Sequence, residues 1–290
     1  MPPQGWVVID STVDVPAGIE DFTVVPCLVS IGNQTFRDGV DLTREAYYRL
    51  IRDTREMPHT SQPPPGVFEE VFRQLTDDGS EIVSIHSASA LSGIFNSASV
   101  AAANLPDRRI HLVDSCTTSL GAGWLAVEAA QAIRQGATAE EAADLARAWV
   151  PQVRLMAALG SLEYVRRGGR VNWAAAFLGE LLRIKPLITA IHGEVLLLER
   201  PRTMQRAMQQ MLASALECGT WKRVGVVHAD APDLAEKMLT MVTQYFPLDK
   251  VVKVEAGTAL SSHTGPGTVG LTVLLEAEQG SMAGRKTTSR

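Results

Sequence analysis

Hydrophobic residues in the first half of the chain fall in short runs that each end in acidic or polar residues. Such runs occupy residues 6–10, 82–86 and 109–114 and are rich in valine and isoleucine. Near-continuous apolar runs of this length are typical of buried strands in a parallel sheet. Each run is followed by a hydroxyl-containing loop, and helix-compatible stretches come between the runs. The alternation predicts a doubly wound α/β domain whose polar loops gather at one edge of the sheet.

The segment 82–96 combines these features most clearly. It begins as an apolar strand, turns small and hydroxylated, and continues into a helix-compatible stretch. Backbone N–H groups at the start of a helix have no partner within the helix, and the helix dipole favours an anion there. Ser87, Ser89 and Ser92 add hydroxyl donors, and Gly93 lets a ligand approach the backbone closely. The sequence therefore predicts an anion-binding strand–turn–helix.

Two further stretches of the first half carry proline. Residues 22–31 predict one strand, which Pro26 would place at an edge or a bulge. Residues 58–66 cannot form a regular helix, because their prolines forbid it, and they hold Thr60 and Ser61 on a stiff backbone. On pattern alone, this second stretch is most simply a loop that caps the following helix.

The second half of the chain mixes strands and helices less regularly. It predicts a helix at 139–150, an apolar helix at 173–182, a strand hairpin over 184–198 and a polar turn at 261–267. We expect a smaller α/β (α+β) domain here. The expected divisions are a Rossmann-like domain at 1–155 that carries the polar loops, a second domain at 156–280 and a polar tail at 281–290.

Composition narrows the functional classes. A length of 290 residues suits two domains, and the net charge of −5 without any long basic run argues against a nucleic-acid-binding surface. No apolar run approaches the roughly 20 residues that cross a bilayer, and the first residues lack the pattern of a signal peptide. Three scattered cysteines favour a reducing cytoplasm over a disulfide framework.

The sequence patterns bear on nucleotide binding, metal binding and serine hydrolysis. Glycine motifs for dinucleotides or a P-loop are absent, and no closely spaced histidine pair indicates a metal site, so neither a cofactor nor a metal is expected. Serine, histidine and aspartate are all present, but the G-x-S-x-G nucleophile elbow is not. A serine hydrolase acting on lipid esters, with Ser89 and His263 as its reactive residues, is one of two functions considered for this sequence; the other follows from the motifs described next.

Seven short motifs occur in a fixed order across nearly the whole chain. They are Asp10-Ser-Thr12, Thr60-Ser-Gln-Pro63, Ser89-Ala-Leu-Ser-Gly93, Val113-Asp-Ser115, Arg167-Gly-Gly-Arg-Val171, Leu182-Arg-Ile-Lys-Pro186 and His263-Thr-Gly-Pro-Gly267. On these motifs the chain resembles the DegV family of fatty-acid-binding proteins. The resemblance implies a lipid-binding protein, not an enzyme, that holds one long-chain fatty acid between two domains. It further implies a bacterial, cytoplasmic subunit that presents the carboxylate to the separate ATP-using subunit of fatty acid kinase, with transient membrane contact.

The resemblance also implies roles for individual residues. Thr60 and Ser89 match the hydroxyls that bind the carboxylate, and Ser92 and Gly93 stand in the adjoining turn. The expected head-group vicinity comprises Ser61, Ser119, Arg170 and His263. The chain departs from the family where Ser87 replaces a usual apolar residue and Ala88 replaces a serine. Apolar residues that suit an acyl tunnel, or equally an ordinary core, are Leu178, Leu181, Leu182, Ile184 and Ile188.

Overall fold

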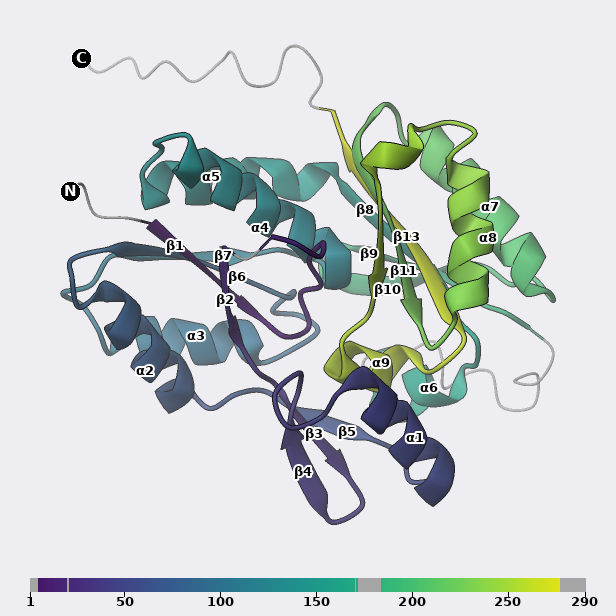
Figure 1. The fold of residues 1–290 in the computed structure, drawn as a ribbon, viewed down its shortest axis with the longest axis horizontal. Helices are drawn as coiled ribbons and strands as arrows, with labels where there is room; N and C mark the ends of the chain where they lie inside the picture. The colour runs from purple at the N-terminus through teal and green to yellow at the C-terminus, as the bar shows by residue number, and fades with distance from the viewer. Residues whose placement is uncertain (1–4, 20, 170, 172–183, 277–290) are drawn as a thin grey trace.

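The computed structural model describes residues 5–19, 21–169, 171 and 184–276, whose strands form three sheets (Figure 1). In the first sheet all neighbouring strands are parallel, as the apolar runs predicted. Its order is β2 (Phe22–Val25), β1 (Gly5–Asp10), β6 (Glu81–His86) and β7 (Ile110–Asp114).

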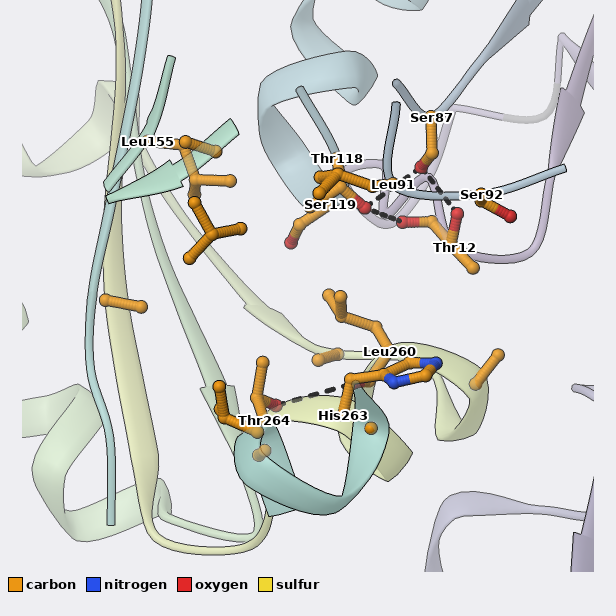
Figure 2. A pocket seen from close by; sticks show the side chains of 18 of the residues that line it. Thr12, Ser87, Leu91, Ser92, Thr118, Ser119, Leu155, Leu260, His263 and Thr264 are labelled. Carbon is orange, nitrogen blue, oxygen red and sulfur yellow. Dashed lines mark hydrogen bonds between the residues drawn. The ribbon is translucent and has the colours of Figure 1, made fainter. Parts of the chain in front are cut away.

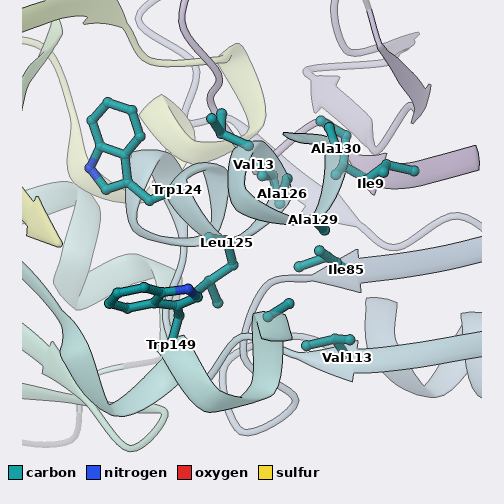
Figure 3. Packing of buried hydrophobic residues seen from close by; sticks show 14 of the residues in the cluster. Ile9, Val13, Ile85, Val113, Trp124, Leu125, Ala126, Ala129, Ala130 and Trp149 are labelled. Atoms are coloured by element: carbon teal, nitrogen blue, oxygen red, sulfur yellow. The ribbon is translucent and has the colours of Figure 1, made fainter. Parts of the chain in front are cut away.

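Helices cover both faces of this parallel sheet, because successive strand residues point to opposite sides. Val8 packs in one cluster with α2 (Pro65–Thr76) and α3 (Ile94–Ala103), whereas Ile9 packs with α4 (Ser119–Arg134) and α5 (Ala139–Trp149). Figure 3 shows the second cluster, in which alanines of α4 lie over the strand residues. A capping box between Thr138 and Glu141 starts α5 where the sequence predicted.

The second sheet has six strands and is mostly antiparallel. Its order is β10 (Glu194–Glu199), β9 (Leu187–Ile191), β8 (Val153–Ala158), β13 (Thr268–Leu275), β11 (Trp221–Ala229) and β12 (Val251–Glu255). Helices α7 (Met204–Glu217) and α8 (Pro232–Val242) cover one face. A parallel Rossmann-like sheet joined to a second α/β unit confirms the predicted fold class. Because β8 begins at Val153, the chain enters the second sheet just before residue 155.

Two predictions from the pattern were wrong. Residues 22–31 form two strands in different sheets, because Pro26 lacks the N–H needed to continue the ladder. After it, β3 (Leu28–Ile31) pairs with β4 (Gln34–Arg37) and β5 (His59–Ser61) in a third, antiparallel sheet. The polar stretch at 261–267 is largely helical, as the end of α9 (Thr258–Thr264). The predicted helix at 173–182 lies outside the described residues.

Distant residues explain why α9 escaped prediction. Asp38 supplies its cap, accepting hydrogen bonds from the backbone N–H groups of Thr258 and Ala259 at 3.0 and 3.2 Å. The cap lies more than two hundred residues away along the chain, so no local motif marks the helix start. Within the described ranges the remaining helices are α1 (Arg44–Thr54) and α6 (Glu163–Gly168), with 3-10 turns at Val150–Gln152 and Leu248–Lys250.

Helix α4 lies between the parallel sheet and the six-stranded sheet. Its residues from Ser119 to Ala130 are all buried, as expected for a helix with apolar or small residues on every side. Glycines permit the close contacts: a Cβ at Gly225 would lie 2.2 Å from Leu120 Cδ2, and one at Gly123 would lie 2.0 Å from the Asp14 carbonyl oxygen. The helix therefore fixes the distance between the two sheets.

Gly123→Ala should destabilise the protein, because the clash is with backbone and the loop after β1 must move. We expect the free energy of unfolding to fall by about 2–3 kcal/mol, as for overpacked cores. Gly66→Ala in α2 is the matched control, since a Cβ there meets nothing within 4 Å. Denaturant titration followed by circular dichroism measures both, and an unchanged midpoint for Gly123→Ala would contradict this packing.

Candidate functional site

A cavity of about 170 Å³ lies between the loop edge of the parallel sheet and the face of the six-stranded sheet opposite α7 and α8 (Figure 2). A single water needs roughly 10–15 Å³ by the same measure, so this space accommodates a sizeable ligand. In Figure 2 the hydroxyls of Thr12, Ser87 and Thr118 gather on one side, and Leu155 lies across the cavity from them. The cavity is thus polar at the loops and apolar along the sheet.

The apolar wall follows from strand register. Ile188, Ala157, Gly270 and Val227 are paired directly across β9, β8, β13 and β11, and all four line the cavity. Directly paired residues share a face of the sheet. The middle two positions are alanine and glycine, so the centre of the row leaves space that larger side chains would fill.

The loops that follow β1, β6 and β7 provide the polar wall. Thr12, Ser87 and Thr118 form a hydrogen-bonded line, with Thr12 Oγ1 to Ser87 Oγ at 2.6 Å and Ser87 Oγ to Thr118 Oγ1 at 2.9 Å. These loops meet because the carboxyl ends of parallel strands lie at one edge of the sheet. The predicted gathering of polar loops at one edge is confirmed.

The buried carboxylate of Asp10 links the loops that follow β1 and β6. Its carboxylate accepts hydrogen bonds from the Thr12 hydroxyl, from the backbone N–H groups of Thr12 and Ser87, and from His86 Nδ1 at 3.1 Å. Burial raises the pKa of Asp10, but the hydrogen bonds and the charge interaction with His86 outweigh it and hold the pKa below its ordinary value. Asp10 is therefore an ionised acceptor beneath the cavity wall.

A serine–histidine–aspartate line does occur, but not where a hydrolase needs it. Ser84 Oγ lies 2.7 Å from His86 Nε2, whose ring bonds Asp10. All three side chains are fully buried and none lines the cavity, so substrate has no access to Ser84. His263 instead bonds Thr60, and Ser89 is exposed. No contact found in the described residues supports the hydrolase alternative.

Thr60 and His263 form a second polar group at the cavity. Thr60 Oγ1 on β5 lies 2.7 Å from His263 Nε2 on α9, and both residues line the cavity. Ser61 and Ser92 also line it, as does Ile94 at the first turn of α3. The N-terminus of α3 thus opens toward the same space.

The structure brings together some of the other predicted site residues and not all of them. Ser119 and Ile188 line the cavity. Ser89 does not: its side chain is exposed and its backbone N–H bonds the Asp114 carboxylate at 3.2 Å. Gly93 is also outside the wall, because the Gln62 amide packs against it. Ile184 is half-buried beside Ile188 in a neighbouring cluster. Arg170, Leu178, Leu181 and Leu182 lie outside the described residues.

Several lining residues were not singled out from the sequence. Thr12 belongs to one of the seven motifs, which is the signal that could have found it; Ser87, by contrast, was expected as a hydroxyl donor of the strand–turn–helix. Gln62 follows Thr60 and Ser61 in the proline-rich stretch. The small residues Ala157 and Gly270 carried no signal, because only the pairing of β8 with β13 shows that they face one space.

Backbone strain marks the loop that follows β7. Ser119 has φ of 54°, an uncommon conformation for a residue other than glycine. Its hydroxyl donates to Asp14 Oδ2 at 2.6 Å, and the Gly257 N–H donates to Asp14 Oδ1 at 2.9 Å. Asp14 therefore ties the start of α4 to the start of α9, both of which border the cavity.

Burial raises the pKa of Asp14 from its ordinary 3.8 to about 6, so the acid costs stability once it ionises. Between pH 4 and 6 the unfolded chain releases this proton before the folded one does. Asp14 should therefore lower the free energy of unfolding by roughly 3 kcal/mol in all as the pH rises from well below its unfolded pKa to well above its folded pKa.

Asp14→Asn removes this ionisation. Denaturant unfolding at pH 4.5 and pH 7 should show the wild type losing roughly 2 kcal/mol relative to the variant as the pH rises. Comparing the two proteins cancels the contribution of the other carboxylates. A difference between them that stays constant with pH would contradict the assignment.

Among the residues that the structure describes, no helix has the length and apolar character to cross a bilayer. Those residues also contain no group of three or more His, Cys, Asp or Glu side chains arranged to hold a metal ion. The cavity is therefore the candidate ligand-binding site of the described residues.

The fold and the cavity together define a three-sheet α/β protein with an internal space that is polar at one side and apolar at the other. A family model described as an uncharacterised protein family, DegV, matches residues 6–276. The chain belongs to the DegV family, which confirms the resemblance seen in the motifs.

Individual relatives agree with this assignment. A DegV domain-containing protein of Staphylococcus aureus (strain MRSA252) is 30% identical, with 92% of this chain and 98% of that protein covered. The solved structure of a DegV family protein from Thermus thermophilus, described by its fatty acid binding, is similar with a TM-score of 0.86 and 28% identity, covering 94% of this chain and 100% of that one. A stearic acid-binding protein from Eubacterium ventriosum gives a TM-score of 0.83 and 27% identity, covering 93% and 97%.

Proposed function

We propose that this protein binds one long-chain fatty acid in the cavity between its N-terminal (1–155) and C-terminal (156–280) units. The observation that carries the proposal is the division of the cavity wall into hydroxyl and imidazole groups at the loops and an apolar row on the sheet. The fatty acid binding described for the Thermus thermophilus and Eubacterium ventriosum proteins supports it.

The acyl chain supplies most of the binding free energy in this proposal. Each methylene buried against the sheet contributes roughly 0.8 kcal/mol, and no polar contact is needed along the row from Ile188 to Val227. Ile188 is the residue of the expected acyl tunnel that lines the described cavity. A long chain therefore binds tightly although few groups recognise its head.

The carboxylate needs hydrogen-bond donors, since a buried carboxylate without them is costly. With His263 Nε2–H donating to Thr60 Oγ1, the Thr60 hydroxyl keeps its own hydrogen for a ligand oxygen. The Ser92 hydroxyl and the N-terminus of α3 border the same space. We place the carboxylate here, near Ser61, whose exposure brings the head group close to the surface.

An exposed head group suits a protein that hands its ligand to another. We propose that the chain is a lipid-binding subunit without chemistry of its own and that the ATP-using subunit of a fatty acid kinase phosphorylates the bound carboxylate. An ATP-using partner places the complex in the cytoplasm, and transient contact with a membrane supplies the fatty acid.

Native mass spectrometry tests the binding step. The purified protein is extracted with organic solvent, refolded and incubated with stearic acid, and we expect a mass increase of one fatty acid per chain. Adding a fatty acid kinase subunit and ATP should then yield acyl phosphate only when both proteins are present. A chain that takes up no fatty acid would refute the binding function, and one that binds but is not a substrate for the kinase would refute the partner alone.

A further inference from the structure

The hydroxyl groups of Thr12, Ser87 and Thr118 have a definite hydrogen-bond direction. The Asp10 carboxylate is ionised and has only lone pairs to offer, so the Thr12 hydroxyl donates its hydrogen to Asp10. Thr12 then has no hydrogen left for Ser87, so in the 2.6 Å contact between them Ser87 is the donor.

The same reasoning extends to Thr118. Because the Ser87 hydrogen is directed at Thr12, Thr118 donates in the 2.9 Å contact with Ser87. Its other available acceptor is the Thr12 carbonyl oxygen at 3.5 Å, which lies in the same loops. Whether Thr118 donates to Ser87 Oγ or to the Thr12 carbonyl oxygen, all three hydroxyl hydrogens point into the protein.

What this wall presents to the cavity is therefore oxygen lone pairs. Each of the three hydroxyl oxygens retains an unused lone pair, and the negative charge of Asp10 lies behind them. A carboxylate is disfavoured beside such a wall, whereas a group that donates a hydrogen bond is favoured. The wall thus differs from the Thr60–His263 pair, in which the Thr60 hydroxyl keeps its hydrogen for a ligand when His263 Nε2–H is the donor.

We propose that Thr12, Ser87 and Thr118 form an acceptor site for a hydroxyl group of the ligand, and that the protein prefers long-chain fatty acids that carry a hydroxyl substituent. The inference rests on the proposed fatty-acid function and names its substrate class. A hydroxyl on the acyl chain is costly to bury among apolar residues unless it is hydrogen-bonded, and this site supplies the acceptors. An unsubstituted acid leaves the same lone pairs to a trapped water or without a partner.

Competition binding tests the preference. The affinities of stearic acid and of its 2-hydroxy, 3-hydroxy and 12-hydroxy derivatives are measured for the wild type, for Ser87→Ala and for Thr118→Val, and each result is expressed as the hydroxy-to-parent affinity ratio. We expect one derivative to have the largest ratio, and we expect that ratio to fall about tenfold in both variants. Ser87→Thr keeps the hydroxyl and should retain the wild-type ratio.

Controls separate this proposal from simpler effects. Ser99→Ala removes a hydroxyl that bonds its own helix outside the cavity, and its ratio should equal that of the wild type. Thermal unfolding establishes that each variant is folded. If stearic acid binds but no derivative gives a ratio that responds to Ser87, the acceptor site is refuted while the fatty-acid function stands. If no acid binds the wild type, the proposed function fails and the acceptor site fails with it.

Discussion

Thr60→Ala combined with Ser92→Ala should lower fatty-acid affinity by two to three orders of magnitude while leaving the fold intact. Both hydroxyls line the cavity beside the N-terminus of α3, where we place the carboxylate. Hydrogen bonds to a charged group contribute roughly 1.5–3 kcal/mol each, and losing two of them leaves the buried carboxylate poorly solvated. Isothermal titration with stearic acid measures the loss, and thermal unfolding reports the fold.

Ser89 provides the matched comparison. The motif resemblance assigns it to the carboxylate, but in the structure it is exposed and absent from the cavity wall. Thr60→Ala combined with Ser89→Ala should therefore weaken binding no more than Thr60→Ala alone. If the Ser89 pair is the weaker binder of the two double variants, the placement of the head group beside Ser92 is wrong.

The comparison of Ser89 with Ser92 shows which features of a site a sequence motif predicts and which it does not. The sequence located the strand–turn–helix at 82–96, and β6 and α3 confirm its course. Which serine faces the ligand depends on the path of the turn, set by contacts such as the bond from the Ser89 N–H to Asp114. Asp114 ends a different strand, so local pattern does not contain that information.

The parallel sheet was predictable for a related reason. The strands β1, β6 and β7 are mainly apolar runs that each precede a polar loop, so their type and their loop edge follow from local pattern, whereas the strand order does not. The split of 22–31 into two strands was not predictable in the same way. Whether Pro26 bends one strand or ends it depends on whether β3 finds other partners, and β5 is one of them from thirty residues further on.

The apolar wall was the part of the site that the sequence predicted least well. The tunnel residues expected from the sequence are apolar leucines and isoleucines between 178 and 188, whereas the space beside Ile188 is created by small residues. Ala157 and Gly270 are paired across β8 and β13. The ligand would occupy the space that larger side chains at these two positions would fill. Small residues in a strand become informative only once their register is known.

Ala157→Phe should therefore make the protein selective against long acyl chains. The ring would project from β8 on the same face as Leu155 and fill the centre of the row from Ile188 to Val227. Displacing four to five methylenes costs roughly 3–4 kcal/mol at about 0.8 kcal/mol each, which is two to three orders of magnitude in the affinity for stearic acid. Decanoic acid, which extends less far from the head group, should lose much less.

The ratio of the two affinities carries this prediction, because any general damage to the head-group site lowers both. Leu196→Phe on β10 is the control: it adds a similar ring to the same sheet at an exposed position outside the cavity wall, and its ratio should remain that of the wild type. Thermal unfolding separates a filled cavity from a damaged core. Equal losses for stearic and decanoic acid in a folded Ala157→Phe variant would mean that the acyl chain does not run along this row, and the apolar path would have to lie elsewhere.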